Sequence, residues 1–285
     1  MLNKIAVLLE MIKFKHTVFA LPFAFMGAFL AGRGVPSLKV FLWVLVAMAG
    51  ARTSAMGFNR IADRRFDAVN PRTANRALPA GEVSLVESWL MVVVSGALFF
   101  LACFMLNRLA LMMAPFALGL TLLYSLTKRF TWLCHMVLGI ALAFSPLGGW
   151  VAVSGTFEGY PWFLSLGVLF WVAGFDTIYA CLDADFDREA GLFSLPARYG
   201  RRRAFHLAVF FHVLAFVFFA ATGYAARLNI YYFGGLIITG CALFYQHIVV
   251  NPTDLSRIRV SFFSMNGIIA ITLFAATWLS LATHG

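Results

Sequence analysis

Two stretches of the sequence carry acidic side chains at spacings that place them on one face of a helix. In the first stretch, Asn59, Asp63 and Asp67 follow one another at intervals of four residues. At about 100° per residue, this interval gives one slanted stripe of oxygen atoms along a helix. The pattern therefore predicts a set of oxygen ligands that point in one direction.

The second stretch, DTIYACLDADFDREAG, begins at Asp176. Tyr179, Asp183 and Asp187 follow at same-face spacings of three, four and seven residues. Asp185 lies about 160° away from the line of Asp183 and Asp187, so we expect it to face solvent or a neighbouring arginine. The second stretch thus also predicts one face of oxygen ligands.

Carboxylate oxygens are ligands that Mg²⁺ takes, often together with substrate phosphates. We expect the two stretches to hold two metal ions through Asp63, Asp67, Asp183 and Asp187, with Asn59 as a neutral ligand. Acids at a helix end can instead form surface salt bridges with neighbouring arginines. Two matching acidic stretches, each followed by an arginine-bearing connection, favour a site for metal and diphosphate over that alternative.

Basic side chains stand close to both stretches in the sequence. Arg72, Arg76, Lys128 and Arg198 are expected to meet the phosphate oxygens that a metal leaves uncovered. The arginines suit this role because a guanidinium donates two parallel hydrogen bonds to such oxygens.

Arg52 stands seven residues before Asn59, two helical turns deeper in the same apolar segment. An arginine at that depth is costly unless it meets an anion. It is interpreted either as a structural partner for a buried acid such as Asp176 or as a clamp for a carboxylate on an acceptor substrate. Tyr124 and Tyr179 share helical faces with charged groups, and for each of them packing and function remain open.

The composition shows what kind of element positions these residues. The chain of 285 residues is 62% hydrophobic and 12% charged, with a mean hydropathy of +0.86. Soluble domains are roughly a quarter charged, so this chain belongs in a lipid bilayer. Its net charge of +10 falls in short segments between apolar runs, which favours membrane orientation over nucleic acid binding.

The apolar runs predict an all-α bundle of about nine transmembrane helices in a single domain covering residues 1–285. Spanning an apolar core of about 30 Å takes roughly 20 helical residues. The breaks in hydropathy place the nine spans near 16–33, 38–63, 84–105, 108–127, 132–154, 161–183, 204–225, 229–250 and 260–283. The first sixteen residues are expected to form an amphipathic helix at the membrane interface.

The distribution of positive charge predicts the orientation. With a cytoplasmic N-terminus and nine crossings, most of the 22 Lys and Arg residues fall on the side that carries both acidic stretches. Only Arg33, Lys39, Arg108 and Arg227 fall on the other side. Because positive loops stay in the cytoplasm, we expect a multi-pass protein of the cytoplasmic (inner) membrane with its site facing the cytoplasm.

At these residues the sequence resembles the UbiA superfamily of intramembrane aromatic prenyltransferases. The first stretch has the form N-x-x-x-D-x-x-x-D followed by NPRTANRALPAG, in which Ala77 replaces the usual proline. The second is similar to the 4-hydroxybenzoate branch, with Phe186 in place of an aspartate. Tyr124-x-x-x-Lys128-Arg129 resembles a diphosphate-binding motif of the family.

The resemblance implies a helical bundle around a cavity and Mg²⁺-dependent transfer of a polyprenyl group from polyprenyl diphosphate to a hydroxylated aromatic carboxylate. That acceptor is 4-hydroxybenzoate, as in ubiquinone biosynthesis, or 1,4-dihydroxy-6-naphthoate, as in the futalosine route to menaquinone. Phe186 and the run GLFSLPARYG are more similar to the second group. Arg52 and Tyr179 would contact the acceptor, and Asp176 is a candidate for removing the ring proton.

Two rival functions remain open from the sequence. A related prenyltransferase with a non-aromatic or tetrapyrrole acceptor would use the same acidic stretches, and Arg52 argues mildly against it. A polytopic transporter would explain isolated buried charges, but not two acidic stretches that are each followed by basic residues.

Overall fold

The computed structural model describes residues 7–8, 10–11, 17–258 and 260–283 of the chain, without the side chains of 17–19 and 260. The interfacial helix expected over residues 1–16 lies mostly outside this part. Within it the chain is all-helical and contains no strands. The helices are α2 (Thr17–Gly32), α3 (Leu38–Val69), α4 (Leu85–Leu106), α5 (Arg108–Thr127), α6 (Cys134–Ser154), α7 (Pro161–Ala180), α8 (Ala184–Glu189), α9 (Leu195–Tyr199), α10 (Arg201–Ala225), α11 (Ile230–Val249) and α12 (Asn266–Ala282), with a π-helical turn, η2 (Val260–Met265), before α12.

The expected spans correspond to the long helices of this bundle. Eight helical segments in the described residues are long and apolar enough to cross a membrane, namely α3–α7, α10, α11 and the continuous segment of η2 and α12. The first expected span is α2, which has 16 residues here and therefore measures about 24 Å. The protein is thus a polytopic membrane protein, with eight such spans and one shorter apolar helix in the described part of the chain.

Local side-chain capping explains several of the helix boundaries. Asn107 ends α4 and begins α5, and its side chain accepts a hydrogen bond from the Ala110 amide at 2.9 Å. Ser84 and Glu87 form a reciprocal capping box at the start of α4. Gly155 ends α6 with a φ of 67°, a left-handed conformation that glycine adopts without strain.

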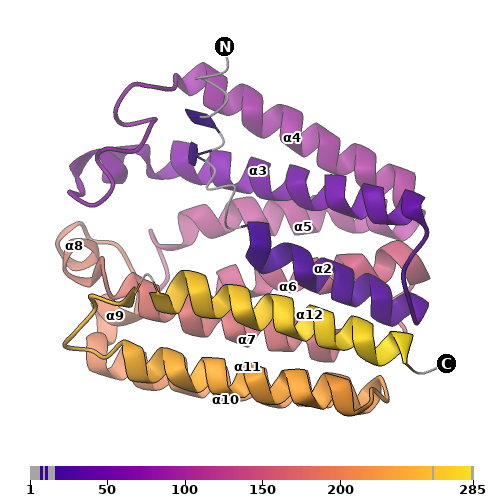
Figure 1. Cartoon of the computed structure of the whole chain (residues 1–285). Coiled ribbons are helices and arrows are strands. Elements are labelled where there is room, and N and C mark those ends of the chain that lie inside the picture. The colour runs from indigo at the N-terminus through magenta and orange to yellow at the C-terminus, as the bar shows by residue number, and fades with distance from the viewer. Residues whose placement is uncertain (1–6, 9, 12–16, 259, 284–285) are drawn as a thin grey trace.

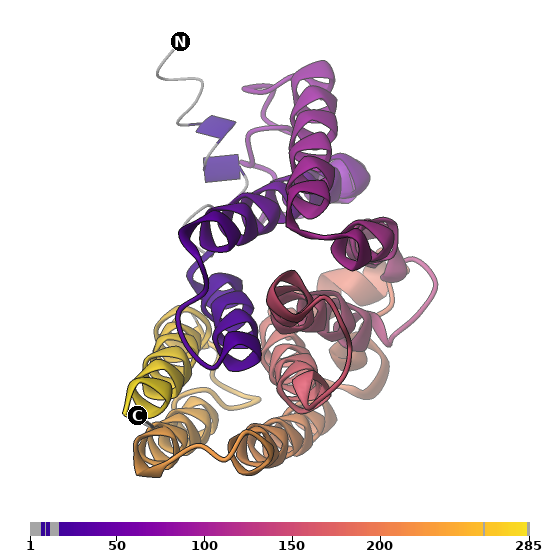
Figure 2. The same ribbon diagram turned by 90° about the vertical axis from the view of Figure 1, so that its right-hand side faces the viewer.

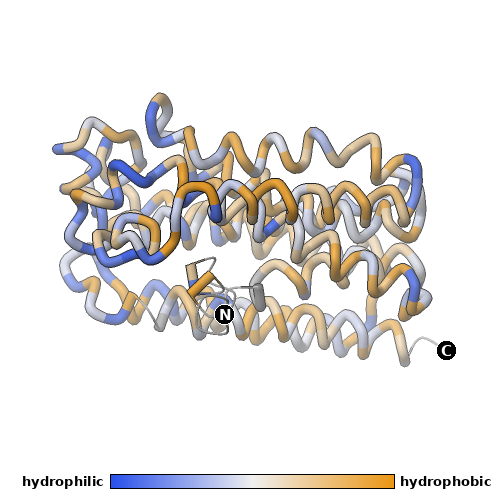
Figure 3. The backbone as a smooth tube through the Cα atoms, turned by 90° about the horizontal axis from the view of Figure 1, so that it is seen from above, coloured by the Kyte–Doolittle hydropathy of each residue, from blue (hydrophilic) through white to orange (hydrophobic). Residues whose placement is uncertain are grey.

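The long helices lie roughly side by side, and α8, α9 and the connection after α3 gather at one end of the bundle (Figure 1). Viewed from the opposite end of the bundle, the helices surround a central region (Figure 2). Helices that follow one another along the chain pack against one another. Hydrophilic residues collect at the two ends, whereas the middle is mostly hydrophobic (Figure 3). This arrangement fits an apolar band that crosses a bilayer between two wet surfaces.

The short helix α2 is held in the bundle by close contact with α6. A Cβ added at Gly149 would overlap the carbonyl of Ala24, and one added at Gly27 would overlap the carbonyl of Pro146. Small residues let two membrane helices approach in this way. The contact brings Ala20 and Ala24 to the wall of the cavity described next.

Candidate functional site

A cavity of about 470 Å³ opens between the helices. Its walls come from each of the helices α2 to α8 and from the π-helical turn, and its polar end lies beside the connection after α3. Deeper in the bundle the lining is largely apolar and small, with Ala47, Ala51, Ala110, Ala114, Ala117 and Ala141 among its residues. The cavity thus joins a charged head to an apolar interior.

The first acidic stretch lies on α3, as its spacing predicts. This helix has 32 residues and measures about 48 Å, so it extends well past a hydrocarbon core of about 30 Å. The expected span 38–63 ends too early, because the helix continues to Val69. Asn59 Nδ2 donates a hydrogen bond to Asp63 Oδ2 at 2.9 Å, and both residues line the cavity.

Asp67, one turn further along α3, is buried and meets two arginines. Arg76 Nη1 donates to its carboxylate at 2.7 Å, and Arg60 Nη1 lies 3.8 Å from it. The hydroxyl of Thr73 donates to the Asp67 carbonyl at 3.1 Å, which holds the connection against the end of the helix. The predicted placement of Arg76 at the site is therefore found.

The second acidic stretch departs from the continuous helix that the spacing predicts. α7 ends at Ala180 instead of 183, and Asp183 is the residue before α8. The amides of Cys181, Leu182 and Asp183 bond to carbonyls three residues earlier, at 3.1, 3.2 and 3.0 Å, which tightens the turn. Asp183 and Asp187 still lie one helical turn apart, because the Asp187 amide bonds to the Asp183 carbonyl at 2.7 Å.

Asp183 is paired across the cavity with the connection that follows α3. Its two oxygens accept bonds from Arg72 Nε at 2.7 Å and Nη2 at 2.5 Å, and Asn70 Nδ2 donates to it at 3.2 Å. Burial alone would raise the pKa of Asp183, but the hydrogen bonds and charge of Arg72 lower it below the usual value. Burial alone would lower the pKa of Arg72. The hydrogen bonds and the charge of Asp183 outweigh this effect, so the pKa of Arg72 is raised.

Asp187 is nearly completely buried and meets Lys128, whose Nζ lies 3.2 Å from Oδ2. Burial alone would lower the pKa of Lys128, whereas the Asp187 carboxylate raises it above the usual lysine value. The Phe193 amide donates to the Lys128 carbonyl at 2.6 Å, so the chain after α8 is tied to the connection between α5 and α6. Asp187 and Lys128 both line the cavity, as the sequence predicts.

All four aspartates of the predicted metal site line this one cavity. Their hard oxygen atoms fit Mg²⁺ by type. Among the described residues, however, no three His, Cys, Asp or Glu side chains come close enough to form a metal site by themselves. Instead, three of the four carboxylates are engaged by Arg72, Arg76 and Lys128.

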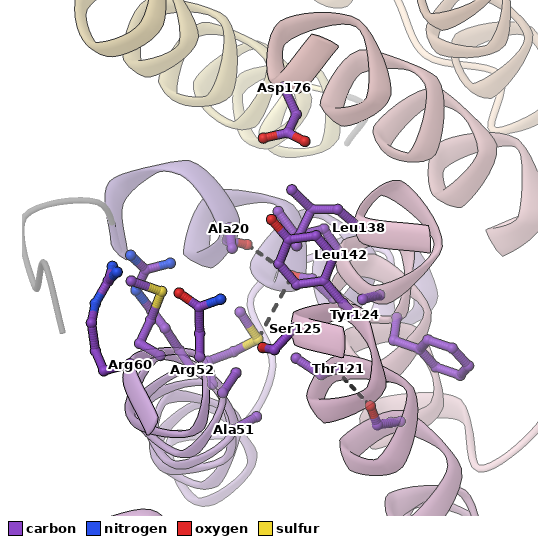
Figure 4. Close-up of a pocket in the computed structure, with 18 of the residues that line it drawn as sticks. Ala20, Ala51, Arg52, Arg60, Thr121, Tyr124, Ser125, Leu138, Leu142 and Asp176 are labelled. Atoms are coloured by element: carbon purple, nitrogen blue, oxygen red, sulfur yellow. Dashed lines mark hydrogen bonds between the residues drawn. The ribbon is translucent and has the colours of Figure 1, made fainter. Parts of the chain in front are cut away.

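Three further predicted residues line the deeper part of the cavity. Figure 4 shows Arg52 on α3 and Tyr124 on α5 on two sides of the space, with the Asp176 carboxylate reaching in from α7. Asp176 Oδ2 lies 2.6 Å from Nδ1 of His135, so the structure gives this acid a histidine partner. Arg52 lines the same cavity as Asp176.

Tyr179 stands at the junction between the charged and apolar parts. Its hydroxyl accepts a hydrogen bond from Arg72 Nη1 at 3.4 Å, and its ring lies 5.6 Å from the guanidinium carbon. Phe262, from the π-helical turn, packs 4.4 Å from the Tyr179 ring and also lines the cavity. These two rings form an aromatic wall next to the Asp183 pair.

Two residues near the second stretch do not reach the cavity. Arg198 is exposed on α9 and is absent from the cavity lining, although the sequence predicts it at the phosphate site. The Asp185 side chain is 66% exposed and pairs with Arg188 at 3.3 Å and Arg201 at 2.8 Å. The expectation that Asp185 faces solvent or a neighbouring arginine is confirmed.

Sequence reasoning missed four residues at this site. Asn70 could have been found as the asparagine of the Asn-Pro turn that ends the first stretch, and Arg60 as a basic residue between Asn59 and Asp63. His135 and Phe262 stand in apolar runs and give no signal of their own. Only the packing of α6 and of the π-helical turn brings them to the cavity wall or to Asp176.

Residues 20–268 match the UbiA prenyltransferase family. A 4-hydroxybenzoate octaprenyltransferase of Shewanella woodyi is 32% identical over 225 residues, covering 79% of this chain and 78% of the relative. The enzyme of the same name from Shewanella pealeana is 31% identical over 253 residues, which cover 88% of each chain.

Solved structures show the same fold. The apo structure of a UbiA homolog from Aeropyrum pernix aligns with a TM-score of 0.85 and 36% identity, covering 92% of this chain and 96% of the homolog. A UbiA homolog from Archaeoglobus fulgidus, solved with GPP and Mg²⁺, aligns with a TM-score of 0.72 over 97% of this chain and 100% of its own. At 19% identity the second likeness concerns the fold alone.

Proposed function

This chain belongs to the UbiA prenyltransferase family, and from that premise we propose that it transfers a polyprenyl group from polyprenyl diphosphate to a hydroxylated aromatic carboxylate. The observation that carries the proposal is the single cavity, which joins four aspartates and three cations at its polar end to Arg52 and an apolar interior. A diphosphate, a hydrocarbon chain and an acidic acceptor each find matching chemistry there.

The charged end of the cavity suits a diphosphate. Arg72, Arg76 and Lys128 now neutralise Asp183, Asp67 and Asp187, with side chains that are 33%, 28% and 30% exposed. Because each cation lies at the cavity edge beside a buried acid, it can turn to a phosphate oxygen when a divalent metal takes over that acid.

Mg²⁺ is the metal that the donor set suits best. Asp63, Asp67, Asp183 and Asp187, with Asn59, would hold it, and the diphosphate would complete a coordination that the protein alone does not provide. Bound there, the metal would neutralise charge on the departing diphosphate oxygens. The structure of a family member with GPP and Mg²⁺ supports this choice.

The deeper residues suit the acceptor. Arg52 would hold its carboxylate, and the aromatic wall of Tyr179 and Phe262 would cover its ring. The relatives named 4-hydroxybenzoate octaprenyltransferase support 4-hydroxybenzoate. Phe186, which also lines the cavity, is the residue at which this sequence favours 1,4-dihydroxy-6-naphthoate instead.

The reaction follows from these placements. The bond between the first prenyl carbon and the diphosphate oxygen breaks, and its electron pair leaves with the diphosphate. The π electrons of the ring form the new carbon–carbon bond to the allylic cation. The ring proton then passes to Asp176, and the C–H electron pair restores aromaticity. The apolar lining keeps water away from the cation.

The charge distribution supports a setting for this reaction. The end of the bundle that carries α8, α9 and the connection after α3 also carries most of the arginines, so we place it in the cytoplasm and the chain in the inner membrane. Water-soluble acceptors would then reach the cavity from the cytoplasm, and the prenyl donor from the bilayer.

The decisive experiment is incubation of the purified protein with Mg²⁺, a labelled polyprenyl diphosphate and a panel of aromatic acids, followed by mass identification of the product. We expect one prenylated hydroxy acid and free diphosphate. Prenylation only of a non-acidic or tetrapyrrole acceptor would overturn the acceptor assignment. Substrate counterflow in proteoliposomes with no covalent product would favour a transporter.

A further inference from the structure

His135 is a buried histidine that the proposed reaction does not yet use. It lies in the first turn of α6, is completely buried, and stands 41 residues before Asp176 in the sequence. Its Nδ1 is 2.6 Å from Asp176 Oδ2, and its Nε2 accepts a hydrogen bond from the Leu195 amide at 3.3 Å. One ring nitrogen therefore meets a carboxylate, and the other meets a backbone N–H.

These two contacts assign the proton on the ring. A backbone N–H can only donate, so Nε2 of His135 must offer its lone pair to Leu195 and carries no proton. The neutral ring then has its proton on Nδ1, from which it donates to the Asp176 carboxylate. An imidazolium would turn an N–H against the Leu195 amide, which disfavours that form.

The Nδ1–H tautomer of His135 engages one of the two carboxylate oxygens of Asp176. Its Oδ2 is occupied by the His135 donor, so its second oxygen, Oδ1, is left for the cavity that the residue lines (Figure 4). A carboxylate held through one oxygen by a fixed donor keeps its orientation and its capacity to accept a proton on the other. His135 thus sets the direction of the acid without touching the substrate.

The support for His135 is itself anchored to the diphosphate end. Leu195 begins α9, and the segment before it is tied to the connection between α5 and α6, where the Phe193 amide donates to the Lys128 carbonyl at 2.6 Å. Cys134 Sγ contacts the Phe193 carbonyl at 3.6 Å. The same segment follows Asp187. Its contacts therefore position both the pair of Asp187 with Lys128 and the ring of His135.

We propose that His135 is a positioning residue for ring deprotonation, fixed as the Nδ1–H tautomer by the Leu195 amide so that it aims Oδ1 of Asp176 at the acceptor carbon that loses its proton. This proposal rests on the proposed prenyl transfer. In the step itself, the proton leaves the ring carbon for Oδ1, the C–H electron pair returns to the ring, and the proton is later released to solvent.

The test compares His135→Gln with His135→Met. Glutamine offers an amide N–H for Asp176 and an amide oxygen for Leu195, whereas methionine fits the space and offers neither. We expect His135→Met to lower turnover roughly a hundredfold, as misplacement of a reacting group does. His135→Gln should keep turnover within about tenfold of the wild type, because both hydrogen bonds are replaced in kind.

A kinetic isotope effect separates positioning from general damage. The probes are geranyl diphosphate and 4-hydroxybenzoate, the latter with or without deuterium on the two carbons beside the hydroxylated carbon. If only 1,4-dihydroxy-6-naphthoate reacts, its correspondingly deuterated form replaces the benzoate. The isotope effect should rise in His135→Met, because proton removal becomes slow, and should stay near the wild-type value in His135→Gln. The control Thr277→Val, which removes a buried hydroxyl of α12 that bonds to the Leu273 carbonyl and does not line the cavity, should not raise it.

Two results would overturn the proposal. One is an isotope effect in His135→Met equal to that of the wild type, which would mean that His135 only supports the fold. The other is a ¹⁵N spectrum of the histidine-labelled protein in which the His135 signal, identified by its loss in His135→Gln, shows a protonated Nε2. The spectrum needs no turnover, so it judges the tautomer even if product assays refute the prenyl transfer.

Discussion

At the scale of single residues, the site is a set of charge pairs that a substrate can rearrange. Three aspartates that the sequence predicts as metal ligands are paired with basic side chains from other segments. These are the same basic side chains that the sequence predicts to bind diphosphate. Charges buried in pairs are costly to separate unless new partners replace the old ones. We therefore expect the pairs to give up their members only to a metal and a diphosphate together.

This exchange predicts a sharp difference between two neighbouring acids. Asp187→Asn removes a charge that is buried against Lys128, and we expect turnover to fall about 100- to 1000-fold. Asp185→Asn, the matched control, removes an exposed charge and should leave turnover nearly unchanged. Excess EDTA should abolish activity and added Mg²⁺ should restore it. Full activity with EDTA, or an unimpaired Asp187→Asn protein, would contradict the metal assignment.

Arg52 predicts how the protein distinguishes acceptors. If Arg52 binds the acceptor carboxylate, Arg52→Lys loses the paired hydrogen bonds and Arg52→Ala also loses the charge. A charged hydrogen bond contributes about 1.5–3 kcal/mol, so acceptor affinity should fall roughly tenfold to a hundredfold in Arg52→Ala. Prenyl diphosphate binding should hardly change.

The measurement for Arg52 is the preference for an aromatic acid over its decarboxylated analogue, taken as a ratio of kcat/KM values. That ratio should shrink in Arg52→Lys and shrink further in Arg52→Ala. An identical ratio in folded wild-type and Arg52→Ala proteins would make Arg52 a structural residue.

At the scale of helices, the two acidic stretches reach the cavity on elements of different build. α3 carries its acidic stretch on one unbroken helix that extends past the membrane core, whereas α7 stops and a tight turn leads into α8 before its acids appear. The turn lets the chain after α8 fold back onto the connection between α5 and α6. That return is what brings Asp187 to Lys128.

The contact between α2 and α6 predicts opposite effects of alanine at two adjacent glycines. Gly149→Ala would place a methyl group against the Ala24 carbonyl, which should cost about 1–3 kcal/mol through strain. Gly148→Ala meets no atom within 4 Å and should gain up to about 1 kcal/mol from helix propensity. Thermal unfolding in detergent measures both, and equal melting temperatures for the two variants would show that this contact is loose.

At the scale of the whole molecule, the bundle separates a charged end from an apolar interior. Hydrophilic residues mark both ends, but both acidic stretches and the cations that bind them lie at only one of them. The cavity runs from this end into the bundle. Because most arginines lie there as well, we expect the end proposed to bind diphosphate to be the cytoplasmic end.

Labelling from one side of the membrane tests this orientation. Glu189→Cys places a thiol in exposed α8, and Thr156→Cys places one in the exposed loop between α6 and α7 at the opposite end. A membrane-impermeant maleimide should label Thr156→Cys in right-side-out vesicles and Glu189→Cys in inverted ones, with permeabilised vesicles as the control for reactivity. The reverse pattern would place the site outside the cytoplasm.

The sequence by itself determined those features that depend on neighbours along the chain. Hydropathy located the long helices, because each must be apolar for about 20 residues to cross the bilayer. Helical periodicity put Asn59, Asp63 and Asp67 on one stripe and turned Asp185 away from Asp187, and the structure agrees in both cases. These predictions hold because the geometry of one helix is fixed whatever surrounds it.

Only the tertiary structure decided which residues meet across the bundle. Arg72 pairs with Asp183, 111 residues away, whereas Arg198, close to that acid in sequence, is exposed. His135 reaches Asp176 because α6 packs against α7 and the chain after α8 folds back to place the Leu195 amide on its ring. Such contacts depend on helix packing and on where turns interrupt a helix, and neither is written in the spacing of residues within one segment.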